Sequence, residues 1–293
     1  MIQGGILNVS KPEGMNSTSL VSIVKRQFKF KKVGHFGTLD PFATGVMLIG
    51  VDQGTKLSPY VMALKKEYRG VVKLGVSTDT LDPTGKVIAT SAPPWPTEEM
   101  IRQEVKRWVG YVDQAVPEFS AVKIQGVRMY EAARKGTPLE QPVRKVVIDS
   151  IELLNCRGEE FEIEVKCSKG TYMRSLASDI AKGLGAEGML ARLGRNAIGK
   201  FRIEQAITVE ELKSFSLDQL ICHPCWTPLS LVLDDLPRVR FPDRVVMKIL
   251  HGQVPLLPPL EGPRVRLCNR DGELVGLAKR EGIVWTLERV FPI

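Results

Sequence analysis

The sequence lacks several features that identify common protein classes. No stretch of about 18 consecutive apolar residues occurs in the 293 residues, which excludes a helix that spans a membrane. The first residues contain no basic stretch followed by an apolar one, as a signal peptide would. Cysteines are few, scattered and odd in number, which argues against a disulfide framework. We therefore expect a cytoplasmic protein with reduced thiols at Cys156, Cys167, Cys222, Cys225 and Cys268.

Motifs for metals and cofactors are also missing. The sequence has no Walker-type phosphate loop, no strand-associated GxGxxG, no HExxH and no GxSxG. Three histidines leave little room for a histidine-built metal centre. Cys222-His-Pro-Cys225 has the spacing of half a zinc site, but no second cysteine pair completes four ligands. These cysteines are therefore expected to be ordinary packing residues.

The composition is that of a globular chain with an excess of positive charge. Hydrophobic residues make up 43% and charged residues 25%, so a sizeable core can be buried. Lysine and arginine number 41 against 33 acidic residues, which gives a net charge of +8 and suggests a polyanionic partner such as nucleic acid. The length allows roughly two domains.

Hydrophobic periodicity predicts a mixture of strands and helices. The expected strands are 5–9, 46–51, 67–76, 86–90, 120–124 and 161–167. The expected helices are 17–28 with Ser17 as N-cap, 55–65, 129–135, 243–250, and further ones from Glu98, after Gly170 and from Thr208. Residues 113–149 break the pattern and indicate an excursion from the main sheet. From residue 234 a proline-rich connector and a hairpin signal, Asn269-Arg-Asp-Gly272, predict a small β domain.

Basic residues gather in stretches that contain few or no acids. These stretches are 15–39, 188–203 and 120–149. Their cations are Lys25, Arg26, Lys29, Lys31 and Lys32; Arg192, Arg195, Lys200 and Arg202; and Lys123, Arg128, Arg134, Lys135, Arg144 and Lys145. Such clusters suit phosphate contacts, although a merely solvated surface is an alternative for any one of them.

Asp40 is the residue of greatest chemical interest. It stands in a glycine-punctuated loop between a predicted helix and a buried strand, where functional side chains are common. An aspartate before a proline also commonly does no more than shape a turn. The residue types alone leave both interpretations open.

The surrounding sequence resembles the TruB family of tRNA pseudouridine synthases. Gly34-His-Phe-Gly-Thr-Leu-Asp-Pro-Phe-Ala-Thr-Gly-Val46 is similar to the family's active-site motif, and further blocks follow the same order over residues 4–212. These blocks are Gly5-Ile-Leu-Asn-Val-Ser-Lys-Pro-Glu-Gly14, Lys66-Glu-Tyr-Arg69, Gly75-Val-Ser-Thr-Asp-Thr80, Asp82-Pro-Thr-Gly85, Pro117-Glu-Phe-Ser-Ala-Val-Lys123, Cys167-Ser-Lys-Gly-Thr-Tyr-Met-Arg174 and Leu190-Ala-Arg-Leu193. Phe36 departs from the family, which often has a small or polar residue there.

The resemblance implies an α+β fold and a domain division. Residues 1–233 would form a pseudouridine synthase domain with a central mixed, mainly antiparallel sheet flanked by helices and loops. Within it, 113–149 would be an RNA-clasping insertion. Residues 234–293 would form a small C-terminal PUA-like RNA-binding domain.

The resemblance also implies an activity and a set of site residues. The chain would isomerise the T-loop uridine of tRNA, at conventional position 55, to pseudouridine by base flipping, with no cofactor or metal. Asp40 would be the nucleophile, Arg174 its ion-pair partner, and Tyr68 the residue that stacks on the uracil. Tyr172 and Leu190, the latter expected on a helix, would line the base pocket, and His35 would fill space left by flipped bases. Lys123 and Arg128 would bind RNA, and Lys11 and Pro12 would support the active-site loop.

The expected partner is the T-stem-loop of tRNA, bound by a monomer that needs no other protein and contacts no membrane. Two other functions stay open. A non-catalytic tRNA-binding or tRNA-folding protein would keep the same basic surface. A metal-dependent hydrolase would use His35, Asp40 and the cysteines, but lacks a recognisable ligand set.

Overall fold

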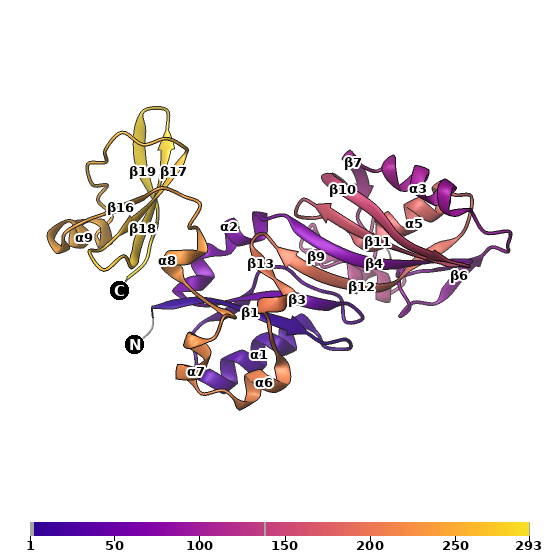
Figure 1. Ribbon diagram of the computed structural model, residues 1–293, viewed down its shortest axis with the longest axis horizontal. Coiled ribbons are helices and arrows are strands. Elements are labelled where there is room, and N and C mark those ends of the chain that lie inside the picture. The colour runs from indigo at the N-terminus through magenta and orange to yellow at the C-terminus, as the bar shows by residue number, and fades with distance from the viewer. Residues whose placement is uncertain (1–2, 138, 293) are drawn as a thin grey trace.

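A computed structural model describes residues 3–137 and 139–292 of the chain. Its main feature is a long twisted sheet with strand order β14-β1-β3-β12-β4-β11-β10-β7, onto which β2, β13 and β15 are added (Figure 1). The strands are β1 (Gly4–Lys11), β2 (Val33–His35), β3 (Thr44–Asp52), β4 (Lys66–Leu74), β7 (Gly110–Ala115), β10 (Val143–Arg157), β11 (Glu160–Cys167), β12 (Gly188–Ile198), β13 (Phe201–Arg202), β14 (Ile207–Thr208) and β15 (Trp226–Pro228). Among the described strand pairs of this sheet, β1 with β14 and β3 with β12 are parallel and the others are antiparallel, which confirms the predicted mixed, mainly antiparallel sheet.

Helices lie against the two halves of this sheet. The helical segments of this part are α1 (Ser17–Phe28), η1 (Gln53–Leu57), α2 (Ser58–Ala63), α3 (Glu98–Lys106), α4 (Met129–Arg134), α5 (Met173–Gly183), η2 (Ile203–Gln205), α6 (Val209–Ser214), α7 (Leu217–Cys222) and α8 (Leu229–Val232). The apolar stripe of α5 packs with α3 on β4, β10 and β11 to form one core. A second core joins α1, α6 and α7 to β1 and β3. The loop around Asp40 connects β2 to β3; its Leu39, Phe42 and Ala43 belong to the first core, whereas β3 contributes to the second.

Several predicted boundaries change in the structure. Residues 55–65 form η1 followed by α2 rather than one helix, because Pro59 has no N–H and starts a new helix. The strand expected at 67–76 ends at Leu74, and Val76 begins the hairpin of β5 (Val76–Thr78) and β6 (Val87–Thr90). The excursion expected at 113–149 is shorter than predicted, because 113–115 belong to β7 and 143–149 to β10 of the main sheet. Between these two strands, the described residues form the short hairpin of β8 (Lys123–Ile124) and β9 (Val127–Arg128), so the strand expected at 120–124 begins only at Lys123.

The C-terminal part is a small β unit, as predicted. Its sheet has the order β16-β17-β18-β19, with strands β16 (Arg238–Arg240), β17 (Arg264–Cys268), β18 (Leu274–Glu281) and β19 (Val284–Val290), and it is covered by α9 (Asp243–Leu250). Part of its apolar surface packs against the main sheet. Leu274, Leu277 and Phe291 share a core with residues of β1, β3, α2 and α8. The C-terminal sheet is therefore anchored on the main sheet, while the boundary at residue 233 stays a prediction. No helix among the described residues is long and apolar enough to cross a membrane.

Candidate active site

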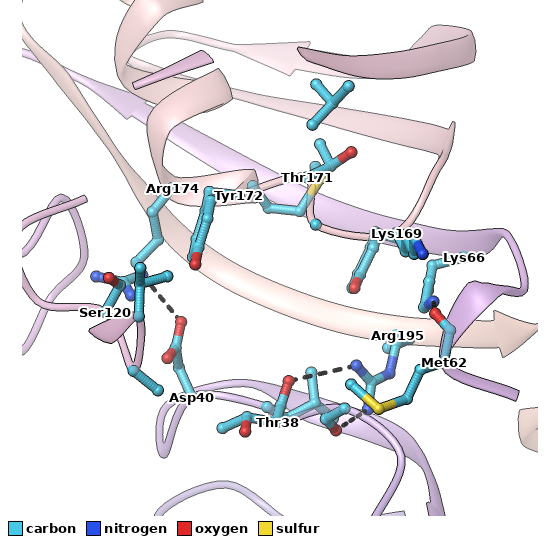
Figure 2. A pocket seen from close by; sticks show the side chains of 18 of the residues that line it. Thr38, Asp40, Met62, Lys66, Ser120, Lys169, Thr171, Tyr172, Arg174 and Arg195 are labelled. Carbon is cyan, nitrogen blue, oxygen red and sulfur yellow. Dashed lines mark hydrogen bonds and ion pairs between the residues drawn. The ribbon is translucent and has the colours of Figure 1, made fainter. Parts of the chain in front are cut away.

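A cavity of about 900 Å³ opens between β4, the start of α5 and the loop that contains Asp40. Side chains from all three point into it, together with residues 119–122 of the excursion (Figure 2). Six of the lining residues are basic and, among the described residues, Asp40 is the acidic one. The basic residues are Lys66, Arg144, Lys145, Lys169, Arg174 and Arg195. Such a lining suits an anionic ligand.

Asp40 and Arg174 form an ion pair at one end of the cavity. Arg174 Nε lies 2.9 Å from Asp40 Oδ2, and Figure 2 shows the two side chains approaching from opposite walls. The arginine side chain is 5% exposed and the aspartate side chain 35% exposed. The carboxylate is thus oriented by a buried cation and still reaches the cavity.

Further contacts make Arg174 rigid. Its Nη1 donates to the carbonyl of Thr80 at 2.7 Å and its Nη2 to the carbonyl of Phe119 at 3.0 Å. Asp82 Oδ2 lies 3.8 Å from Arg174 Nε, and its other oxygen accepts hydrogen bonds from the Thr80 hydroxyl and the Thr84 N–H. Asp82 is 4% exposed. This contact of Asp82 with Arg174 was not predicted, although Asp82 belongs to the Asp82-Pro-Thr-Gly85 block that resembles the family.

The backbone around Asp40 is held at five successive carbonyls. The carbonyls of Gly37 and Thr38 accept from Arg195 at 3.2 and 3.4 Å. That of Leu39 accepts from the Ser17 hydroxyl at 2.9 Å, which also accepts from the Leu39 N–H at 3.1 Å. The carbonyl of Asp40 accepts from Ala43 N–H at 3.1 Å. That of Pro41 accepts from Gly14 N–H at 2.7 Å and Lys11 Nζ at 3.2 Å.

Ser17 therefore differs from its predicted role as an N-cap. Asn16 is the N-cap of α1, without a side-chain hydrogen bond, and Ser17 begins the helix. The Ser17 hydroxyl instead forms hydrogen bonds with both the carbonyl and the N–H of Leu39, the residue before Asp40. These hydrogen bonds connect α1, which contains part of the first basic stretch, to the loop that carries Asp40.

Arg195 is buried rather than exposed to RNA, which corrects the expectation that it contacts phosphates. It is 2% exposed, lies on β12, and donates to the carbonyl of Val46 at 2.8 Å as well as to the loop. Gly45 permits the backbone of Arg195 to pair closely with β3, since the φ of Gly45 is +105° and a Cβ there would lie 2.3 Å from the carbonyl oxygen of Arg195. The remaining cations of the stretch 188–203 form ion pairs: Arg192 with Glu160, Lys200 with Asp234, and Arg202 with Glu67. That stretch is thus largely engaged within the protein.

Tyr68 and Lys66, both on β4, line the cavity opposite Asp40. Tyr68 is 8% exposed, and burial raises the pKa of its hydroxyl although the Arg195 guanidinium opposes the shift. Burial, with Arg195 adding, lowers the pKa of Lys66 to about 8. Its ammonium donates to the carbonyls of Met62 at 2.6 Å and Leu64 at 2.5 Å.

Tyr172 lines the cavity next to Arg174, and a buried glutamine fixes its backbone. Gln114 Nε2 donates to the Tyr172 carbonyl at 3.0 Å, and the Tyr172 N–H donates to Gln114 Oε1 at 2.7 Å. Burial raises the pKa of the Tyr172 hydroxyl. The clamp holds the N-cap residue of α5, which lies only two residues before Arg174.

Leu190 does not line the cavity. It lies on strand β12 rather than on a helix, is fully buried, and packs in the core under α5. Leu193, three residues later and on the same strand, borders the cavity instead. The strand has a register irregularity against β4 between these positions, which the residue pattern does not reveal.

Other predicted residues lie outside the cavity lining. His35 is on β2 next to the loop; its Nδ1 is buried with no partner among the described residues, and burial and Arg195 lower its pKa. Lys123 and Arg128 are exposed on the β8–β9 hairpin, where Arg128 Nη1 donates to the Tyr130 hydroxyl at 2.9 Å. Pro12 is half-buried, and its carbonyl accepts from Lys11 Nζ at 2.9 Å.

Phe36 is accommodated by local packing. It is 2% exposed, and its ring lies over Gly50 of β3, where a Cβ would come within 2.3 Å of the ring. The departure from the family at this position is therefore matched by a glycine on the neighbouring strand.

The cysteine pair shows no metal-site arrangement. Cys222 is exposed and Cys225 is buried, and the Cys225 N–H donates to His223 Nδ1 at 3.2 Å. Within residues 3–137 and 139–292, no group of three or more His, Cys, Asp or Glu side chains could hold a metal ion. His35, Asp40 and the cysteines are not brought together, so the residues of the hydrolase alternative form no centre.

Residues 25–173 match the family described as TruB family pseudouridylate synthase, N terminal domain. The chain is 39% identical over 283 residues to tRNA pseudouridine synthase B of Syntrophobacter fumaroxidans, covering 93% of this chain and 92% of the relative. It is 36% identical over 294 residues to the protein of that name from Caldanaerobacter subterraneus subsp. tengcongensis, covering 98% and 99%.

A solved structure of an H/ACA RNP bound to a substrate RNA containing 2′-deoxyuridine superimposes with a TM-score of 0.73 at 23% identity, covering all of this chain and 86% of that one. This similarity confirms the predicted fold. The family match and the two relatives lead to one assignment: the chain belongs to the TruB family of pseudouridylate synthases.

Proposed function

We propose that the protein isomerises a uridine of tRNA to pseudouridine, with Asp40 as the reacting carboxylate. The observation that carries the proposal is the ion pair of Asp40 with buried Arg174 at 2.9 Å, at the end of a cavity lined by cations. Family membership supports the reaction class, and the relatives' name, tRNA pseudouridine synthase B, supports tRNA as substrate.

The reaction breaks the bond between uracil N1 and C1′, turns the base and rejoins it through C5, with no net redox change. An aspartate carboxylate can serve as nucleophile or electrostatic partner in such a step, as carboxylates do in glycosidases. Asp40 is exposed to the cavity by about a third, which leaves room for attack. Arg174 would keep the carboxylate aimed at the substrate.

The target uridine has to leave the folded RNA loop to reach Asp40. Extrusion costs a few kcal/mol of stacking, which contacts elsewhere must offset. We propose that Tyr68 stacks on the extruded uracil and helps to remove its C5 proton. Tyr172 and Leu193 would border the base, and His35 would occupy space that the flipped bases vacate. Arg144, Lys145 and Lys169 at the cavity, and Lys123 and Arg128 on the hairpin, would contact the RNA backbone.

The proposed substrate position is the T-loop uridine, conventional position 55. We propose that a monomer acts on it in the cytoplasm, without cofactor, metal or protein partner. The test uses a T-stem-loop hairpin with tritium at C5 of that uridine. Release of tritium and appearance of pseudouridine at this position are expected from the purified chain. Binding without release would instead favour the non-catalytic tRNA-binding alternative, and modification only outside the T-loop would overturn the substrate assignment.

Replacing Ser17 with alanine is expected to lower kcat about tenfold with little change in RNA affinity. The variant leaves the buried N–H and carbonyl of Leu39 without their partner, so the residue next to Asp40 is free to shift. Ser17→Thr keeps the hydroxyl and should restore kcat, as a positioning role requires. Ser22→Ala on the same helix removes a hydroxyl that donates only within α1, and should change neither value. Single-turnover rates and Kd separate the two effects. An unchanged kcat in Ser17→Ala would contradict the role.

Activity is expected to fall as the pH rises through about 8, because Lys11 loses a proton there. Burial, with Arg195 adding and Asp40 and Glu13 opposing, lowers the pKa of Lys11 to about 8. Its ammonium donates to three carbonyls, those of Pro12, Met15 and Pro41. A neutral amine has two hydrogens for three carbonyls, so the contact to the residue after Asp40 weakens.

Global unfolding can be separated from this loop effect. The pKa of Lys11 is about 8 when folded against the ordinary 10.5, so the unfolded chain binds more protons between these values. The contribution of Lys11 to stability therefore rises with pH across that window. A fall in kcat of the wild type from pH 7.5 to 9 without a fall in Tm supports the prediction. The kcat of Lys66→Met should show the same fall with pH. The kcat of Lys11→Met should be low and should not fall further over this range. A wild-type kcat that stays constant to pH 9 would refute it.

A further inference from the structure

A second cavity lies at the junction between the main sheet and the C-terminal sheet. It measures about 650 Å³ and is lined from one side by η1 and α2 and from the other by β19 and Gly252, the second residue after α9. The lining residues are Thr55, Lys56, Pro59, Gly252, Leu287, Glu288, Arg289 and Val290. Nothing in the proposed chemistry at Asp40 requires this cavity.

Two cations line it and a third lies beside it. Lys56 and Arg289 line the cavity from its two sides. Lys32 lies beside the start of η1, because its backbone exchanges hydrogen bonds of 2.7 and 2.9 Å with Asp52, the N-cap of that helix. The Lys56 ammonium is fixed across the junction, since it donates to the carbonyl of Val290 at 2.8 Å. Burial, followed by the charges of Lys32 and Arg289, lowers its pKa. In residues 3–137 and 139–292, no carboxylate lies within ion-pair distance of these three side chains.

The neighbouring acids are already engaged. Glu288, which lines the cavity, accepts two hydrogen bonds from Arg264, at 2.9 and 3.3 Å. Burial alone would raise the pKa of Glu288, but the hydrogen bonds from Arg264 and Tyr60 outweigh it and the pKa is lowered. Asp52 accepts from the backbone N–H of Lys32 at 2.9 Å. The positive charges of Lys32, Lys56 and Arg289 are therefore available to bind an external anion.

The junction cavity is next to the catalytic one. Pro59, near the start of α2, lines both, so that one short helix separates Lys56 from the end of the catalytic cavity marked by Met62 and Lys66. Figure 2 shows Met62 and Lys66 at the far side from Asp40. Lys32 also continues the basic stretch that begins at Lys25 on α1. A polyanion lying over α2 could contact both cavities at once.

We infer that the junction cavity binds backbone phosphates of the RNA whose uridine enters the catalytic cavity, with Lys56, Arg289 and Lys32 as their ligands. The inference rests on the proposed function for its RNA, and extends it to a site built by both sheets. Holding RNA at the junction offsets part of the cost of base extrusion, because each phosphate contact releases counterions.

The test measures how tRNA affinity depends on salt. Lys56→Gln with Arg289→Gln removes two charges, and a glutamine amide at 56 can still donate toward Val290. With about 0.9 in slope per phosphate contact, the dependence of log Kd on log salt is expected to fall by about 1.8, and affinity at low salt by at least about tenfold. The matched control, Lys106→Gln with Arg157→Gln, removes one lysine and one arginine, both exposed, at the opposite end of the molecule on α3 and β10, and should leave slope and affinity nearly unchanged (Figure 1).

The single variant Arg289→Gln tests whether the effect comes from a weakened contact between the two sheets. Among the described contacts Arg289 donates only to the neighbouring carbonyl of Glu288, so its loss should not weaken that contact. This single variant should lower the slope by about 0.9 with an unchanged Tm. Slopes equal to wild type in both junction variants, or an equal loss in the control pair, would overturn the inference. Binding is measured without turnover, so a failure of the isomerase proposal shows separately, as absence of pseudouridine from the wild-type protein.

Discussion

Replacing Asp40 with asparagine is expected to slow pseudouridine formation by more than about 10³-fold while leaving tRNA affinity within about threefold. The amide is nearly the same size as the carboxylate, so the loop can keep its five held carbonyls. It carries no charge, however, and cannot act as nucleophile or as a partner for positive charge at the sugar. The loss should therefore fall on the chemical step and not on binding.

Two measurements decide this prediction. Single-turnover conversion of a T-stem-loop hairpin reports the chemical step, and fluorescence titration with the same hairpin reports binding. Asp79→Asn is a suitable control, because Asp79 is a nearby carboxylate that accepts only from the Lys86 N–H and lies outside the cavity. Retention of more than a tenth of the activity in Asp40→Asn would remove Asp40 from the reaction and return it to the role of a turn residue.

Arg174→Met is expected to lower the rate by about 10²- to 10³-fold and to destabilise the fold by roughly 2–4 kcal/mol. The substitution leaves Asp82, whose side chain is 5% exposed, next to an apolar side chain. It also leaves the carbonyls of Thr80 and Phe119 without a donor. Asp40 would lose its partner too, but solvent reaches that carboxylate, which keeps the loss below that of a fully buried pair.

Arg174→Lys separates charge from geometry. A lysine restores a positive charge, so most of the stability should return, yet one ammonium cannot reach Asp40, Thr80 and Phe119 with the fixed spacing of a guanidinium. Activity should therefore stay at least about tenfold below wild type. Arg69→Met is the control: Arg69 pairs with Glu162 through two hydrogen bonds on β4, 55% exposed and away from the cavity, and its loss should be nearly neutral. Wild-type rates in Arg174→Lys would mean that charge alone suffices.

The alternating pattern of β11 and the stripe of α5 were predictable because each describes one element whose buried face repeats along the chain. The capping box at Thr208 was predictable for the same reason, since all its partners lie within four residues. The start of α2 near Pro59 and the end of β4 at Leu74 were less predictable, because apolar residues continue across both positions and only local backbone chemistry ends the helix or strand.

Leu190 and Arg195 show where such reasoning fails. Both lie on β12, where a register irregularity decides which side chains face the cavity. An arginine in an acid-free stretch has the composition of an RNA contact, yet Arg195 is surrounded by carbonyls of a loop 158 residues away in sequence. No pattern along the chain records which distant backbone groups need a donor.

By itself, the sequence determined the kind of protein: a positively charged α+β chain whose motifs contain an aspartate in a glycine-rich loop, a tyrosine on a strand and an arginine at a helix start. These are properties of residues close together in the chain, where spacing and periodicity act directly. Only the tertiary structure decided that Asp40 meets Arg174, that Asp82 and Ser17 support them, and that Lys56 and Arg289 line the junction cavity with Lys32 beside it. Such contacts depend on strand register and on the anchoring of one sheet upon another, which join residues that are far apart in sequence.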